Sequence, residues 1–244
     1  MHGEGIREHR AAATTAGILY ITGSVAGVLS MTLSAPIRDA DDPFGYAAEH
    51  SGTTTTTGLL VLLMGLSLAF VPVVLFPVLR RTNEMLALGY VVVRGAIETI
   101  AYVVLAIGWL LLVPLGEVVA AGPGTASSAG ARLGGLVIDG EATNAVLTLV
   151  FCLGAGIFYT LLYWSRIVPR WISVWGLVAI PLYVAADLLA MYGFFEANSS
   201  GQVLMFMPLA VQEMVLAVWM IARGFRPAAV DTTHEVAGDT LIAA

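Results

Sequence analysis

The chain has 244 residues, of which 58% are hydrophobic and 11% are charged, with a mean hydropathy of +0.87 and a formal net charge of −6. These values lie far outside those of a soluble globular domain and predict an integral membrane protein. All eleven basic residues are arginine, so lysine Schiff bases and lysine general bases are excluded, and no basic patch favours nucleic acid as a partner.

Six apolar runs follow one another along the chain, and each is long enough to cross a bilayer as a helix. The predicted spans cover approximately residues 14–35, 56–79, 85–113, 143–165, 171–195 and 203–223. We therefore expect an all-α bundle of six transmembrane helices within residues 14–225. A cytoplasmic segment, residues 1–13, precedes the bundle, and a polar tail predicted to be disordered, residues 226–244, follows it. The first span is too long for a signal peptide and no clear cleavage site follows it, so we interpret it as a retained anchor.

The arginines predict the orientation of the spans. Eight of them fall on one side of the predicted membrane: Arg7, Arg10, Arg80, Arg81, Arg166, Arg170, Arg223 and Arg226. Only Arg38 and Arg132 fall on the other side. Because short cytoplasmic loops carry the positive excess, both termini are expected to be cytoplasmic. The arginine-only basic set, with abundant alanine, glycine and valine, is typical of a prokaryotic source and therefore indicates the inner, cytoplasmic membrane.

Histidine and cysteine give no sign of a metal or cofactor site. The four histidines all fall in tails or loops, and Cys152 is the single cysteine. An intramembrane haem pair, a histidine-rich zinc site and an intrachain disulfide are thereby excluded, and we expect neither a metal nor a cofactor. Two long external loops are predicted, residues 36–55 and 116–142, and the acidic residues of the first are interpreted as a solvated surface rather than a cation site.

Four charged residues lie well inside the predicted spans, away from their ends, where charges are expensive and usually functional. Arg94 and Glu98 lie about 13 and 20 Å from the cytoplasmic end of the third helix, and Glu213 lies about 15 Å from that end of the sixth. These three residues therefore share a depth. Asp187, about 24 Å along the fifth helix, is expected closer to the external side and without a charged partner, and we interpret it as a candidate site residue that lines a path from the external side to the other three.

The spacing of four residues places Arg94 and Glu98 on one helical face, where they can pair. Glu213 adds a second carboxylate to one guanidinium, which predicts a site that can take up a proton. Tyr20 and Tyr159 also lie at membrane depth, where their hydroxyls can donate to a ligand or to the carboxylates, although packing is the commoner role of such tyrosines.

Three functions are compatible with this pattern. The first is binding or transport of a small amphipathic or lipid-like molecule, in which Arg94 engages an anionic group and Glu98 or Glu213 exchanges a proton. The second is an intramembrane enzyme that uses Glu98 and Glu213 as acid and base, although no nucleophile, metal ligand set or cofactor motif accompanies them. The third is a structural or regulatory subunit, in which Arg94 or Glu213 would face lipid or a partner helix. Membrane lipid is the expected partner, with a small-molecule ligand possible, and the oligomeric state stays open.

Short motifs along the six spans resemble one known family. They are AGILY at residues 16–20, Arg94 with Glu98, SRIVPRW at residues 165–171, the segment from Glu213 to Trp219, and Arg223 with Gly224. In this order and spacing they resemble the prokaryotic family called domain of unknown function 4386, over about residues 14–225. The resemblance implies a six-helix integral membrane protein without an established activity, and it marks Tyr20, Arg94, Glu98 and Glu213 as positions of interest without giving them roles.

Overall fold

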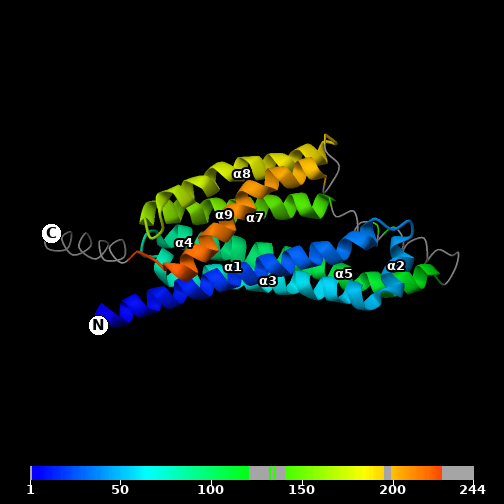
Figure 1. Cartoon of the computed structure of the whole chain (residues 1–244), viewed down its shortest axis with the longest axis horizontal. Coiled ribbons are helices and arrows are strands. Elements are labelled where there is room, and N and C mark those ends of the chain that lie inside the picture. The colour runs from blue at the N-terminus through cyan, green and yellow to red at the C-terminus, as the bar shows by residue number, and fades with distance from the viewer. Residues whose placement is uncertain (1, 121–131, 133–134, 136–140, 195–198, 227–244) are drawn as a thin grey trace. The chain divides into compact units, whose positions relative to one another are not determined.

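The computed structural model describes residues 2–120, 132, 135, 141–194 and 199–226, and within these residues the regular structure is helical throughout (Figure 1). The principal elements are α1 (His2–Arg38), α2 (Pro43–Glu49), α3 (Ser51–Leu79), α4 (Glu84–Tyr90), the π-helix η1 (Val91–Ile97), α5 (Glu98–Ala120), α7 (Glu141–Ser165), α8 (Arg170–Met191) and α9 (Ser200–Ala222). The predicted all-α fold class is confirmed.

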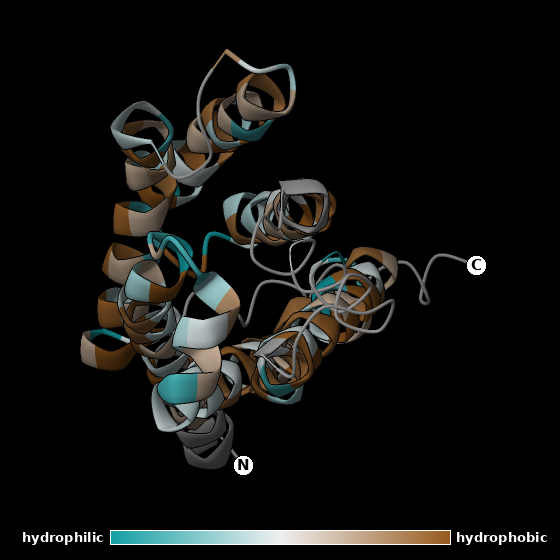
Figure 2. Ribbon diagram, turned by 90° about the vertical axis from the view of Figure 1, so that its right-hand side faces the viewer, coloured by the Kyte–Doolittle hydropathy of each residue, from teal (hydrophilic) through white to brown (hydrophobic). Residues whose placement is uncertain are grey.

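Six helical stretches are long and apolar enough to cross a membrane. They are His9–Arg38, Ser51–Leu79, Glu84–Val119, Val146–Ser165, Arg170–Met191 and Ser200–Ala222. The third stretch is continuous through α4, η1 and α5. Figure 2 shows these helices nearly end-on, with hydrophobic residues in brown on each of them. The six predicted spans are thus confirmed, and the chain is a multi-pass membrane protein.

The helices extend beyond the predicted spans. α1 begins at His2, so the segment predicted to precede the bundle is already helical, and the third span continues to Ala120. The predicted loop over residues 36–55 instead contains the end of α1, the short helix α2 and the start of α3. Asp42 caps α2 by accepting a hydrogen bond of 3.0 Å from the backbone N–H of Gly45. Helical hydrogen bonding continues past the point where hydropathy falls, because polar residues are tolerated in a helix outside the bilayer core. Most of the second predicted loop and the tail after Arg226 lie outside the described residues.

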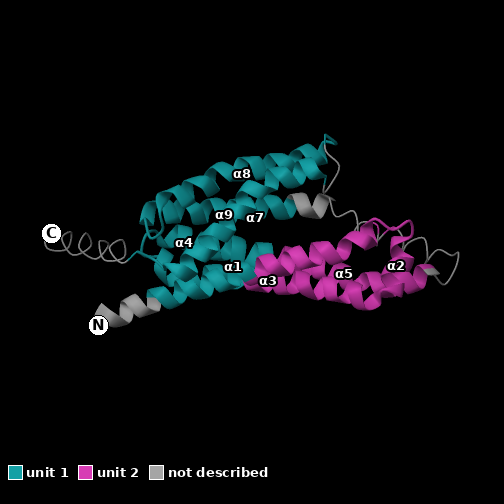
Figure 3. Ribbon diagram, viewed as in Figure 1, with its two compact units in different colours: residues 1–21, 68–98, 145–244 teal, residues 22–67, 99–144 magenta. Residues whose placement is uncertain are grey.

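The structure divides into two compact units, which are described separately (Figure 3). Unit 2 consists of residues 22–67 and 99–144. Its helices approach closely at glycines: a Cβ atom added to Gly65 would lie 2.5 Å from Cβ of Tyr102, and one added to Gly27 would lie 2.7 Å from Sδ of Met64. Small residues allow this approach in membrane bundles, and Gly27 belongs to a G-x-x-x-G motif.

Unit 1 consists of residues 1–21, 68–98 and 145–244, and it contains every predicted site residue. Its core holds stacked aromatic rings: Tyr90 lies parallel to Phe158, with 4.8 Å between ring centroids, and Tyr20 stacks on Phe158 at 6.4 Å. α8 and α9 pack against each other. α9 ends at Ala222, and Gly224, two residues later, has a φ of 67°, the left-handed conformation common after a helix C-terminus. These elements enclose the intramembrane charges.

Candidate functional site

The π-helix η1 presents Arg94 to the core of unit 1. The backbone N–H of Glu98, the first residue of α5, donates to the carbonyl of Val93, five residues earlier. This wider turn lies in the middle of an otherwise regular transmembrane helix. Single π turns are rare and occur frequently at functional sites, and here the turn contains Arg94, which lies well inside the third predicted span.

Arg94 lies between two carboxylates. Its Nη1 is 3.6 Å from Oε2 of Glu98, and its Nη2 is 3.5 Å from Oε1 of Glu213. Arg94 and Glu98 are each 1% exposed, whereas Glu213 is 14% exposed. The three residues that share a predicted depth therefore lie together, and Glu213 is the least buried of them. Both distances exceed the 2.7–2.9 Å or so of a close charge-assisted hydrogen bond.

Aromatic rings complete the surroundings of the guanidinium. Its central carbon lies 4.8 Å from the ring centroid of Phe151 and 5.5 Å from that of Tyr20, within the range of a cation–π interaction. A Cβ atom added to Gly154 would lie 3.3 Å from Cβ of Arg94. Glycine at this position of α7 therefore lets η1 approach closely enough for Phe151, one turn earlier, to meet the guanidinium.

The charges within this cluster do not balance. With all three groups ionised, one guanidinium and two carboxylates have a net charge of −1, and one proton taken up by either glutamate makes the cluster neutral. Burying charge in a membrane is costly, so a neutral cluster is the cheaper state. The arrangement can thus store and release a proton at Glu98 or Glu213.

Buried polar atoms continue from Glu213 into α7 and α8. Within the described part of the chain, the Tyr159 hydroxyl, Oγ of Ser173 and Oε1 of Gln212 have no hydrogen-bond partner. Nε2 of Gln212 donates to the Ile172 carbonyl at 3.0 Å. Buried polar groups without partners are uncommon and often interact with water or a bound group. Ser173 and Gln212 were not singled out from the sequence, although each is a polar residue inside an apolar run.

The two predicted tyrosines lie in this region. Tyr20 contacts the guanidinium, and its hydroxyl lies 3.5 Å from that of Tyr90. Tyr159 is fully buried, and its ring fills the space beside Gly176, where an added Cβ would lie 2.6 Å from the ring. Glu213 is among the electrostatic neighbours of Tyr159. Both tyrosines therefore belong to the surroundings of the charges.

Asp187 lies away from the cluster of Arg94, Glu98 and Glu213. Nε2 of Gln202 donates a hydrogen bond of 2.7 Å to Oδ1 of Asp187, and Gln202 lies eleven residues before Glu213, about 16 Å along α9. The structure does not bring Asp187 to the Arg94 cluster. The structure also gives Asp187 a neutral partner, the amide of Gln202, which the sequence interpretation did not include.

An open, mostly apolar groove of about 640 Å³ runs along the other side of α9. Its lining includes Val211, Met214, Val215 and Val218 but none of Arg94, Glu98 and Glu213. Because Val211 and Val215 are each two residues from Glu213, their side chains leave the helix on nearly the opposite side. The groove is therefore separate from the charge cluster.

Metal ligation receives no support: within the described residues, no three histidine, cysteine, aspartate or glutamate side chains gather in a way that could hold a metal ion. The free thiol of Cys152 is buried in α7. The guanidinium and the two carboxylates themselves offer ionic pairing, proton exchange and hydrogen bonding.

Comparison with known proteins agrees with the motifs in the sequence. No curated protein and no solved structure matches the chain. The family described as Domain of unknown function (DUF4386) matches residues 15–224, which include all six membrane-spanning stretches except the first residues of α1. This match covers far more than half of the chain, and the chain therefore belongs to the DUF4386 family.

Proposed function

We propose that this protein binds or transports a small amphipathic or lipid-like molecule in the prokaryotic cytoplasmic membrane, through an anionic group that pairs with Arg94. One observation carries the proposal: a fully buried arginine is shared by two carboxylates, of which Glu213 alone is partly exposed. One carboxylate is enough to balance the charge of an arginine that serves only packing. The second carboxylate allows Arg94 to keep one partner while it exchanges the other.

Proton uptake by Glu213 is the exchange step. A protonated Glu213 no longer attracts Nη2 of Arg94, and the guanidinium then has one remaining carboxylate, Glu98. An anionic ligand group takes the place of Glu213, since charge-assisted hydrogen bonds to a guanidinium are strong in a dry environment. The ligand and the proton thereby stabilise the same state of the protein. Loss of the proton restores the pair between Arg94 and Glu213 and expels the ligand.

The burial of Arg94 favours this role over that of a subunit whose charges pair with a partner helix. Such a subunit would expose the guanidinium to lipid, but Arg94 is 1% exposed and is covered by Phe151 and Tyr20. The buried hydroxyl of Tyr159, without a hydrogen-bond partner among the described residues, is a further donor available to a ligand near Glu213.

A thermal-shift experiment tests the proposal with two amphiphiles that share one tail. Decanesulfonate remains anionic at every pH used, and decyltrimethylammonium is its cationic counterpart. We expect decanesulfonate to raise the Tm of the wild-type protein in lipid nanodiscs, and to raise it more at mildly acidic than at mildly basic pH. A ligand present at about 100 times its Kd adds about 2.7 kcal/mol to the free energy of unfolding.

The Glu213→Gln variant is the control for proton linkage. It cannot ionise at this position, so decanesulfonate should raise its Tm by the same amount at every pH, while decyltrimethylammonium should leave both proteins unchanged. Equal shifts with the two amphiphiles would show that only the tail is recognised. Identical pH responses of the wild type and the variant would remove Glu213 from the mechanism.

A further inference from the structure

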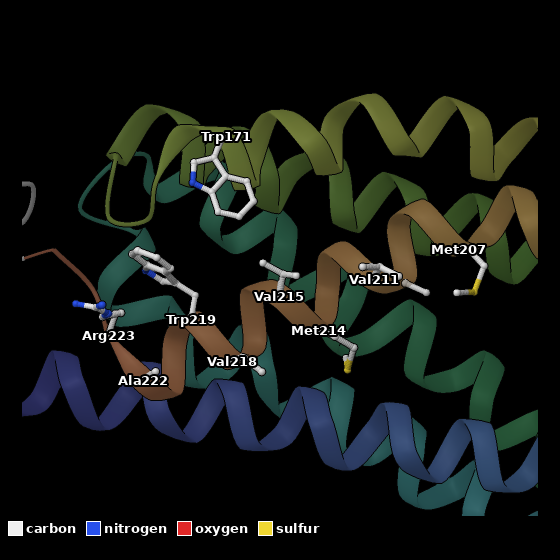
Figure 4. Close-up of a pocket in the computed structure, with 10 residues that line it drawn as sticks. Trp171, Met207, Val211, Met214, Val215, Val218, Trp219, Ala222 and Arg223 are labelled. Carbon is white, nitrogen blue, oxygen red and sulfur yellow. The ribbon is translucent and has the colours of Figure 1, made fainter.

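The groove on the outer side of α9 is a second candidate site. Trp171 at the start of α8 turns toward Trp219 and Val215 of α9, and the groove continues along α9 past Val211 to Met207 (Figure 4). Nine of its ten lining residues are apolar or aromatic, and Arg223 is the single charged one. The groove thus combines an apolar channel with one cation at its end.

The apolar part of the groove lies within a membrane span. Val211, Val218 and Met207 are 41%, 57% and 46% exposed, and all three belong to the stretch Ser200–Ala222 that is able to cross a membrane. A contiguous apolar surface at this depth contacts acyl chains rather than water. The occupant must therefore present a hydrocarbon tail.

The charged end of the groove has the composition of a headgroup region. Arg223 follows the last residue of α9, and Trp219 lies one turn before it. Arg10 of α1 lies beside the same helix end, since a Cβ added to Gly224 would be 3.7 Å from Cγ of Arg10. Tryptophan and arginine together are typical of the membrane interface, and basic residues there attract anionic lipids. Trp219 lines the groove next to Arg223, and its indole Nε1 is itself buried.

The dimensions agree with a lipid tail. Met207 and Arg223 are sixteen residues apart, which corresponds to about 24 Å along the helix axis. One leaflet contributes about half of the 30 Å hydrocarbon thickness of a bilayer. A chain that starts at Arg223 and reaches the bilayer midplane is therefore accommodated along its whole length.

We propose that this groove binds an anionic phospholipid, with one acyl chain along Val218, Val215 and Val211 and the phosphate at Arg223, next to the ring of Trp219. The orientation predicted from the arginines places this end of α9 in the cytoplasmic leaflet. The proposal does not depend on the function proposed for Arg94, since Glu213 lies on the other side of the helix.

The two groove tryptophans provide the experiment, in a background in which the other three, Trp109, Trp164 and Trp175, are replaced by phenylalanine. The protein is reconstituted with mixtures of phosphatidylglycerol and phosphatidylcholine in which one lipid has brominated chains, and the quenching of tryptophan fluorescence gives the relative binding constant of the two lipids. We expect the protein with Arg223 intact to favour phosphatidylglycerol about fivefold, the preference that one interfacial arginine supplies. Arg223→Gln should lose this preference, whereas Arg81→Gln, which removes a charge on the same predicted side away from the groove, should retain it.

A second pair of variants tests the channel. Val211→Phe fills the groove and should weaken quenching of Trp171 and Trp219 by either lipid, whereas Val178→Phe, at a position on α8 that is 70% exposed and outside the groove, should not. Equal binding constants of the two lipids in the protein with Arg223 intact, an equal loss of preference with Arg223→Gln and Arg81→Gln, or undiminished quenching in Val211→Phe would each overturn the proposal. None of these measurements involves decanesulfonate or Glu213, so their failure leaves the Arg94 proposal untouched.

Discussion

Replacing Arg94 by methionine should lower the free energy of unfolding by about 3–5 kcal/mol, the cost of breaking a buried ion pair by removing one partner. Methionine has a similar length and fills the space beside Phe151 and Tyr20, but it leaves Glu98 and Glu213 as two carboxylates with no guanidinium between them. Denaturant titration in mixed micelles measures the loss. Arg81→Met is the matched control, because Arg81 is exposed in the turn before α4, and its effect should stay within about 0.5 kcal/mol.

A second substitution separates charge from packing in this variant. Adding Glu213→Gln to Arg94→Met removes one of the two uncompensated carboxylates, so the double variant should be more stable than Arg94→Met alone. The two effects are therefore expected to be strongly non-additive, with a coupling energy in the range of about 0.5–3 kcal/mol found for residues in one network. Additive losses would mean that Glu213 contributes nothing to holding Arg94 in place.

Gly17→Ala should lower the free energy of unfolding by about 1–3 kcal/mol, the usual cost of overpacking a tight contact. A Cβ at this position would lie 2.7 Å from the backbone carbonyl oxygen of Ala217 and 2.7 Å from Cγ1 of Ile221. A side chain can rotate away, but a backbone oxygen cannot, so α1 and α9 must separate. Thermal unfolding in nanodiscs is a suitable measurement.

The control for this effect is another glycine of unit 1. A Cβ added to Gly156 of α7 would have Cδ1 of Ile180 as its nearest neighbour, at 3.9 Å, which is an ordinary contact. Gly156→Ala should be neutral or stabilising by up to about 1 kcal/mol, since alanine is the better helix former. Equal destabilisation by the two substitutions would contradict the close approach of α1 and α9.

Much of the fold was predictable because a bilayer imposes simple rules. The six spans follow from apolar length alone, since a helix is the way a single segment satisfies its backbone in lipid. The meeting of Arg94, Glu98 and Glu213 followed from equal depth, because a rise of about 1.5 Å per residue converts sequence position into height within the membrane. Depth also separated Asp187 from the other three.

Other features depend on packing that has no signature in one sequence. The same residues, Val91–Ile97, can form an α-helix or a π-helix, which differ in their hydrogen-bond register. Hydropathy is the same in both, so it does not predict the π turn. The contact of Gly17 with Ala217 depends on which faces of α1 and α9 meet, and the partner of Asp187 depends on the rotation of α9. Helical rotation sets these contacts, and it cannot be obtained from depth.

The number of protons taken up with each ligand tests the central claim most directly. Isothermal titration calorimetry of decanesulfonate binding, repeated in two buffers with different ionisation enthalpies at one pH, gives this number. The account predicts an uptake approaching about one proton per bound anion in the wild type, at a pH where Glu213 is ionised before binding, and none in Glu213→Gln. Binding without proton uptake in the wild type, or the same uptake in the variant, would contradict a site in which Glu213 releases Arg94 to the ligand.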